Sequence, residues 1–458
     1  MRTRDYLIAA LAVSTAFASP ADARKKQPPA PPVAVRPAPI LALPGSPNAA
    51  TVNYFYERRQ EAPLWYGQAG GPQAIADLLT ILRRAGVDGY PQGPQVAAQV
   101  EARVAAAAGG DVLARKTAER ALSNAWVDYV QALQRPNTNV IWGDPALTLK
   151  PAHPDRILAL LSGSPSIAPH LASASGINPY YKALRDQALL EAGADGTASA
   201  RTLLNLERAR MLPASGKWIL VNTAEQRLHL MEGGQSVGSM KVVVGDKEHY
   251  SLPTPIIAST MYYAIANPYW HMPDHLVRKA AVKIAKEGQA YMTRNGYEVL
   301  TSFGPDAQVV PISSVDWKAV AAGTSKVLIR QKPNSINSMG KMKFPFANKE
   351  GIYLHDTPKK EYFSLSNRAK SNGCIRVENY RALASFVMGR DVASSGSAPE
   401  QQMALPRGIP VYVTYLTQAP GADGKLATFT DTYGWDRPGV LAGGLDISAN
   451  ATFTGGRN

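Results

Sequence analysis

Cys374, the only cysteine in 458 residues, follows His355 within the stretch 351–377. A thiol attacks as its thiolate, which at neutral pH requires a base or a positive electrostatic field. His355 is a candidate base, and Arg376 adds positive charge just beyond the cysteine. These residue types in this order indicate nucleophilic catalysis by Cys374. The alternative is a buried structural cysteine with a histidine on a nearby strand.

Two local sequence patterns predict the secondary structure around these residues. Residues 351–355 predict a short strand, with His355 at its end. Residues 377–388 predict a helix that ends at Gly389. Cys374 would then lie just before a helix N-terminus, where backbone N–H groups and the helix dipole stabilise anions. Gly373 would let the backbone turn tightly beside the nucleophile.

The start of the chain predicts export. Arg2 and Arg4 precede an apolar core at residues 6–17, which is short for a membrane span, and two Ala-x-Ala sites follow. We expect residues 1–23 to be a secretory signal and the protein to act in the periplasm or cell envelope. An uncleaved signal that tethers it to a membrane is the alternative. A lone thiol in an oxidising compartment has no partner for a structural disulfide, which again favours a reactive Cys374.

Residues 24–48 form a Pro- and Ala-rich linker without acidic residues. Such a segment favours extended conformations and cannot bury a core. It is interpreted either as a tether that holds the folded part away from a membrane or wall, or as a plain disordered leader.

The formal net charge of +14 suggests an anionic partner. Export argues against nucleic acid, and the carboxylates of cell-wall peptides fit better. The basic residues concentrate in the stretch 325–349, which contains no acid; they are Lys326, Arg330, Lys332, Lys341, Lys343 and Lys349. A solvated basic face is the alternative interpretation of this stretch.

The first half of the folded chain has helical periodicity. Ile75, Leu78, Leu79 and Leu82 recur at the spacing of one helical face. Helices are predicted at 71–84, 114–133, 154–161, 179–190 and 198–211. No catalytic cluster occurs among them, and we expect Trp65 and Trp126 to lie in the core.

From Gly216 the pattern changes to that of strands. Strands are predicted at 218–222, 227–231, 240–245, 259–265 and 409–415. The chain therefore has the pattern of an α+β multidomain protein, with helices first and strands second.

His355-Asp-Thr-Pro and Ser371-Asn-Gly-Cys-Ile-Arg376 together resemble a known family signature. They are similar to the L,D-transpeptidase catalytic domain of the YkuD type, in which a histidine is followed by Ser-x-Gly-Cys-x-Arg. The match is closest to the larger, YcbB-like branch. Asn372 stands where many members of the family carry histidine.

The resemblance implies a division of the whole chain. A helical scaffold domain would span 49–213, and a mainly β L,D-transpeptidase catalytic domain would span 214–418. A helical or loop-like lid would be inserted at about 273–346 and would cap the active site. A tail at 419–458 would pack in part on the catalytic domain. The link at 190–200 is too short for the peptidoglycan-binding module that some relatives insert.

The resemblance also implies a reaction. A peptidoglycan L,D-transpeptidase forms 3-3 cross-links between peptide stems through a cysteine thioester, in cell-wall biogenesis, and is a target of carbapenems. Cys374 would be the nucleophile and His355 the general base and acid. The backbone of Gly373 would hold the oxyanion. The residues expected to bind substrate are Tyr353, Ser371, Asn372 and Arg376.

Other interpretations remain open at the level of sequence. If water resolved the thioester, the same site would be an L,D-carboxypeptidase. A non-catalytic wall-binding protein could use the same fold, although it would not need Cys374, His355 and Gly373 together. The acceptor could be another stem or a wall-attached protein, and the oligomeric state is not determined. His271 and His275 have a spacing that could bind zinc, but Pro273 separates them and no third ligand is evident. We therefore expect no metal and no cofactor.

Overall fold

The computed structural model describes residues 43 and 45–437, apart from 138, 193–197, 251, 393–397 and 422. The predicted signal and most of the predicted linker lie outside the described residues. Within the described part, no helix is both long enough and apolar enough to cross a membrane.

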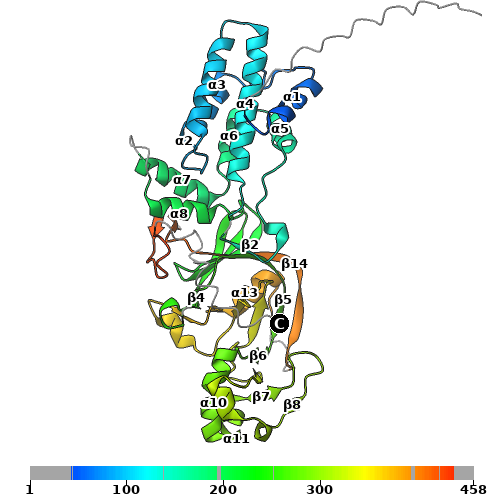
Figure 1. Cartoon of the computed structure of the whole chain (residues 1–458), viewed down its shortest axis with the longest axis vertical. Helices are drawn as coiled ribbons and strands as arrows, with labels where there is room; N and C mark the ends of the chain where they lie inside the picture. Colours follow the sequence, from blue (N-terminus) through cyan, green and yellow to red (C-terminus); the bar gives the residue numbers. More distant parts are fainter. Residues whose placement is uncertain are drawn as a thin grey trace, which may run out of the picture. The chain divides into compact units, whose positions relative to one another are not determined.

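The chain begins with a group of packed helices in which α2, α3 and α4 run alongside one another (Figure 1). Their bounds are α1 Ala49–Arg58, α2 Pro72–Arg84, α3 Gly93–Ala107, α4 Val112–Leu133, α5 Pro154–Ser162 and α6 Ile167–Ser175. Trp65 and Trp126 are fully buried between them, as expected. These two side chains therefore belong to the core rather than to a ligand platform.

Helix α4 is held in this group by a buried carboxylate. Glu119 accepts hydrogen bonds from the backbone N–H groups of Leu64, Trp65 and Tyr66 and from the Tyr56 hydroxyl. A buried carboxylate costs little free energy only when its oxygens are hydrogen-bonded in this way. The contact fixes the loop after α1 against the middle of α4.

The mainly β part is one large sheet that closes on itself. The strand order is β1-β5-β10-β11-β13-β4-β3-β2-β14, and β14 pairs again with β5. The bounds are β1 Ile141–Trp142, β2 Lys217–Asn222, β3 Arg227–Glu232, β4 Gln235–Gly245, β5 Ile257–Ala266, β10 Met342–Pro345, β11 Tyr353–His355, β13 Ile375–Val377 and β14 Gln401–Thr414. All of the predicted strands are present, and the α+β class is confirmed.

The insertion between β5 and β10 has a small core and a sheet of its own. The sheet has the order β6-β9-β7-β8, and buried residues of α10, α12 and β9 pack together beside it. The bounds are β6 Trp270–His271, α10 Asp274–Glu287, α11 Gln289–Asn295, β7 Tyr297–Leu300, β8 Val309–Val310, α12 Trp317–Ala322 and β9 Leu328–Gln331. We call this insertion the lid.

The predicted end of the lid, at about residue 346, is wrong. Met342 pairs with Ala266 of β5, and Lys343 pairs with His355 of β11, so β10 belongs to the large sheet. The same pairs show that the lid leaves and rejoins the sheet beside His355, as expected.

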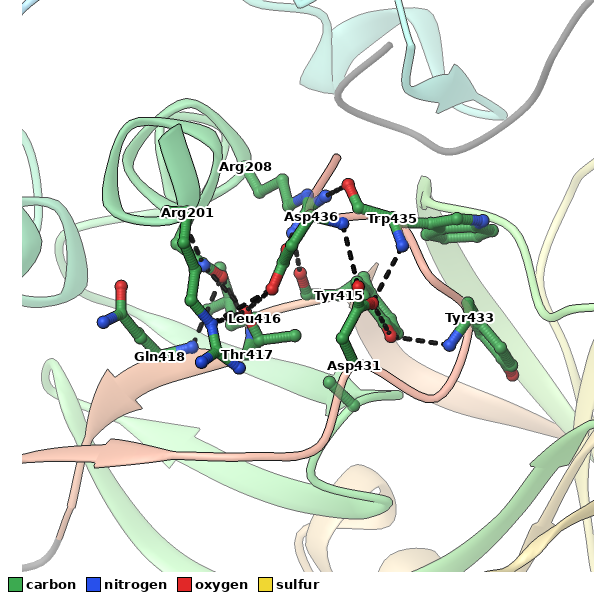
Figure 2. Close-up of polar contacts among 12 residues, drawn as sticks. Arg201, Arg208, Tyr415, Leu416, Thr417, Gln418, Asp431, Tyr433, Trp435 and Asp436 are labelled. Carbon is green, nitrogen blue, oxygen red and sulfur yellow. Dashed lines mark hydrogen bonds and ion pairs between the residues drawn. The ribbon is translucent and has the colours of Figure 1, made fainter. Parts of the chain in front are cut away.

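Helices α7 (Pro179–Ala192) and α8 (Ala200–Ala209) contact the strand β15 (Gln418–Pro420), which pairs with β16 (Leu426–Thr428). Figure 2 shows the polar contacts that fix α8 to the end of the described chain. Fully buried Arg208 forms an ion pair of 2.7 Å with Asp436, and Arg201 forms one of 3.1 Å with the same carboxylate. The described part of the tail therefore packs on α8 as well as on the large sheet.

Candidate active site

Three neighbouring strands bring the candidate residues together. Strands β11 and β13 are parallel, with His355 opposite Arg376, and Cys374 directly precedes β13. On the other side of β11, Lys343 of β10 lies opposite His355. The cysteine and the histidine, far apart in sequence, therefore lie on adjacent parallel strands, with Cys374 just before the start of β13 and His355 at the end of β11.

His355 is 2% exposed, and its ring is fixed by the backbone. Its Nδ1 lies 2.5 Å from the carbonyl oxygen of Asp356. A carbonyl oxygen can only accept, so Nδ1 carries the proton and Nε2 carries the lone pair of the neutral ring. Burial lowers the pKa of His355 to about 3, and the positive charges of Arg376 and Lys343 act in the same direction. The imidazole is therefore a neutral base at physiological pH.

Cys374 is half-buried, and its sulfur lies 3.6 Å from the carbonyl oxygen of Gly351. Burial raises the pKa of the Cys374 thiol. The backbone N–H of Tyr353 and the charges of Lys343 and Arg376 oppose that rise. The resting pair is thus a neutral thiol and a neutral imidazole, and the thiol proton moves as the sulfur attacks.

The prediction that Cys374 precedes a helix is wrong. Residues 375–377 form strand β13, because Ile375 and Val377 bury their side chains on the core side of the closed sheet. Helix α13 (Tyr380–Met388) begins only after this strand, and the side chain of Asn379 caps it. It does end at Gly389, which adopts a left-handed conformation as expected. The helix dipole therefore does not stabilise the Cys374 thiolate directly.

The loop before Cys374 is braced by hydroxyl groups. The buried Ser371 hydroxyl donates to the carbonyl oxygen of Cys374 at 2.6 Å and accepts from the N–H of Gly373 at 3.2 Å. Thr254 Oγ1 donates to the carbonyl oxygen of Gly373 at 2.7 Å. Gly373 has a φ of 103°, which favours glycine. Ser371 thus supports the loop, and the Gly373 N–H would have to leave Ser371 in order to hold an oxyanion.

The other expected substrate residues surround this loop. The Tyr353 ring lies beneath the Lys343 ammonium, which is 4.3 Å from the ring centroid. Arg376 lies over the Tyr362 ring at 5.3 Å. Asn372 lies near His275 of the lid helix α10: burial lowers the pKa of His275, and the Asn372 side chain opposes that lowering. Their roles towards substrate stay predictions.

Sequence reasoning missed the buried carboxylate of Asp356. It accepts from the backbone N–H of Lys341 at 2.8 Å and from the Lys360 ammonium at 2.6 Å. These bonds tie the residue before β10 to the residue after β11, and they fix the carbonyl group that holds the His355 ring. The only sequence indication was its place in the His-Asp-Thr-Pro string.

The basic stretch does not form one free surface. Lys326 pairs with Asp274, and both Arg330 and Lys332 pair with Glu298. Lys341 and Lys349 are exposed, whereas Lys343 is half-buried at the site. Three of the six cations are therefore paired within the lid, where they share two carboxylates.

His271 and His275, the two candidate zinc ligands, make contacts with other side chains. His271 stacks on Phe303 with ring centroids 4.4 Å apart, and His275 lies near the side chain of Asn372. Among the described residues, no group of three or more His, Cys, Asp and Glu side chains could hold a metal ion.

Two family models and a related protein match most of this chain. Residues 216–413 match the family model of the L,D-transpeptidase catalytic domain (YkuD), and residues 50–187 match the model of the Scaffold domain. A Haemophilus influenzae protein named "Putative L,D-transpeptidase" is 25% identical over 405 residues, which cover 85% of this chain and 78% of that protein.

Two solved structures are more distantly similar. One is described as "Structure of the Ldtfm-avibactam carbamoyl enzyme", with 13% identity, 44% of this chain and 50% of that chain covered, and a TM-score of 0.22. The other is an L,D-transpeptidase from Mycobacterium smegmatis, with 13% identity, 44% of this chain and 59% of that chain covered, and a TM-score of 0.21. The matched part spans only half to three-fifths of those chains.

Proposed function

Because this chain belongs to the L,D-transpeptidase family, with a YkuD-type catalytic domain after a scaffold domain, we propose that it cross-links peptidoglycan stems through a thioester at Cys374. The observation that carries the proposal is the register of β11 and β13, which sets His355 beside the strand that follows Cys374. Peptide stems are the substrates that family membership implies, and the 3-3 linkage and the thioester are our proposal.

The reaction proceeds in two acyl transfers. Cys374 Sγ attacks the carbonyl carbon of the third residue of a tetrapeptide stem while its proton moves to Nε2 of His355. The carbon–nitrogen bond to the terminal D-Ala breaks, and the imidazolium returns the proton to the leaving amine. A thioester remains on Cys374.

The side-chain amine of a second stem then resolves the thioester. His355 takes a proton from the attacking amine, the carbon–sulfur bond breaks, and the thiolate is reprotonated. The neutral state of the buried His355 ring suits both steps, since each begins with proton acceptance. If water attacks instead, the product is a shortened stem, and the enzyme acts as an L,D-carboxypeptidase.

The decisive test uses the mature protein and purified tetrapeptide muropeptides. Products identified by mass should include stem dimers that have lost one D-Ala, and Cys374→Ala should give none. Products limited to free tripeptide stems would replace transpeptidation by hydrolysis. No product from the wild type would favour a wall-binding protein.

A carbapenem tests the nucleophile separately, as an acylating analogue of the donor stem. Intact-protein mass spectrometry should show one adduct per chain, mapped by digestion to the peptide that contains Cys374. Cys374→Ala should remain unmodified and should melt like the wild type, because the half-buried thiol contributes little core packing. An unmodified wild type would contradict an activated Cys374.

A further inference from the structure

A half-buried ammonium group at the active site has no acidic partner in contact. Lys343 lies on β10 opposite His355, and its ammonium is 4.3 Å from the centroid of the Tyr353 ring. Among the described residues, no carboxylate forms an ion pair with it, unlike Lys326, Arg330 and Lys332 of the same basic stretch. The Tyr353 ring face attracts a cation and holds this one in place.

Charged or titratable groups around Lys343 come from several elements of the site. Among the described residues they include His355 and Tyr353 of β11, Cys374 and Arg376 at the start of β13, His271 of β6 in the lid, Tyr263 of β5, and Glu400 before β14. Glu400 is the only acid in this group. Its carboxylate already accepts the backbone N–H of Tyr269 at 2.5 Å. Lys343 therefore faces the cysteine without a dedicated counter-ion.

Such a charge costs free energy unless a negative group is supplied during function. Burial lowers the pKa of Lys343, whereas Glu400 and Cys374 act to raise it. A charged group whose pKa is shifted by burial, and which has a specific charged partner nearby, is a candidate for a functional role. The negative charge that arises here is that of the sulfur of Cys374.

The usual counter-ion of a catalytic cysteine is a protonated histidine. That arrangement is disfavoured here, because burial keeps the His355 ring neutral. The positive charges that remain near the sulfur are Lys343 and Arg376, and Lys343 opposes the rise of the thiol pKa more strongly. Arg376 also lies over the Tyr362 ring.

We propose that Lys343 is a positioning residue whose ammonium, held on the Tyr353 ring, balances the negative charge that develops on Cys374 Sγ as the thiol proton leaves. Lys343 forms no bond and gives up no proton: the thiol proton goes to His355 or to solvent. The effect on the thiol is independent of the substrate, whereas its consequence for acyl transfer rests on the proposed function.

The test measures alkylation of Cys374 by iodoacetamide as a function of pH, which needs no peptidoglycan. Lys343→Met keeps a chain of similar length without the charge. We expect its alkylation midpoint to rise by about one pH unit, with about tenfold slower alkylation at neutral pH. Lys343→Arg should restore most of the wild-type profile. Lys343→Gln is a second neutral variant in case the methionine variant does not fold.

Lys341→Met is the matched control, since Lys341 lies in the same stretch but has an exposed side chain. Its contact with Asp356 uses the backbone N–H and survives the substitution. It should leave the alkylation midpoint unchanged. An unshifted midpoint in folded Lys343→Met or Lys343→Gln would overturn the inference, as would an equal shift in Lys341→Met or in Lys343→Arg. If the wild type turns over no muropeptide but the shift is observed, the proposed function fails while the role of Lys343 at the thiol stands.

Discussion

At the scale of single residues, the chemistry depends on how burial tunes His355. A histidine in water has a pKa of about 6.5 and would lose its basic form in mild acid. Burial lowers the pKa of His355 to about 3, so the ring stays neutral throughout the range in which enzymes are assayed. The Asp356 carbonyl fixes which ring nitrogen accepts the proton.

The lowered pKa of His355 predicts an unusual pH profile for the acylation rate. The rate of carbapenem acylation should not decline between about pH 7 and pH 5, because the base is not protonated there. The folded pKa is depressed, so protonation sets in only as the pH falls towards the folded value. A half-maximal rate near the ordinary histidine pKa would contradict the assignment, provided that it disappears in His355→Gln.

Removal of the base gives the complementary prediction. His355→Ala should slow acylation at neutral pH by about 10²–10⁴-fold, with partial recovery at higher pH, where the thiol ionises without help. His355→Gln tests the same loss with less change in volume, since the site is buried. A variant that acylates like the wild type would show that another group accepts the thiol proton.

The positive charge of Arg376 is expected to contribute to acylation. Arg376→Ala should leave folding nearly intact and reduce acylation by about 10²-fold or more, because it removes a positive charge beside the reacting atoms. Acylation rate and melting temperature should be measured on the same preparation. Aggregation, or a large fall in melting temperature, would instead make Arg376 structural through contacts such as that with the Tyr362 ring.

At the scale of elements, the cysteine is positioned by strand pairing rather than by a helix. Strand β13 lies between β11 and β4 in the sheet, so the backbone on the C-terminal side of Cys374 is fixed by its neighbours. The loop on the N-terminal side is braced by Ser371 and Thr254. Helix α13 begins beyond this framework, at a cap formed by Asn379, whose side chain accepts from the N–H of Ala382 at 3.0 Å.

The position of this cap can be tested. Asn379→Ala should lower the free energy of unfolding by about 1 kcal/mol through loss of the capping bond, and Asn379→Asp should retain most of it. The alkylation profile of Cys374 should be the same in both variants. A shifted thiol midpoint in Asn379→Ala would show that the start of α13 does act on the cysteine.

At the scale of the whole described chain, a buried ion pair joins helix α8 to the C-terminal tail (Figure 2). Arg208 is fully buried, and its guanidinium also donates to the carbonyl oxygens of Tyr415 and Trp435. Asp436 is the acid that balances it. The tail thereby contributes to the stability of both the helix and the large sheet.

Asp436→Ala should therefore destabilise the protein by about 3–5 kcal/mol, because it leaves a buried charge without its partner. Asp423→Ala, at an exposed position in the same tail, is the matched control and should stay close to the wild type. Urea unfolding measures both. Equal stability of the two variants would show that the carbonyl groups around Arg208 suffice.

The location of the protein is a proposal at the same scale. The basic start and the Ala-x-Ala sites imply export with cleavage at or before Ala23. N-terminal sequencing of protein from the cell envelope should begin near Ser19 or Arg24. An intact Met1 in that material would instead support an uncleaved membrane tether.

The residue types and their order indicate the chemistry and predict the local elements. A lone thiol, an upstream histidine and a nearby arginine indicate nucleophilic catalysis without any fold, because reactivity is a property of these side chains. Helix and strand periodicity also depends on neighbours in sequence. The helical first half and the strands of the second half were therefore predictable, as was Gly389 at the end of α13.

The arrangement of the site residues depends on the tertiary structure. The short run Ile375–Val377 can begin a helix or form a strand, and pairing with β11 and β4 makes it a strand. In the sequence Lys343 is one of six cations of the basic stretch 325–349, and the register of β10 against β11 places it beside His355. Asp356 and Ser371 support the site through contacts that depend on folded loops. Such pairings join residues distant in sequence, and burial then fixes the pKa values of the groups that they enclose, so no local pattern could determine them.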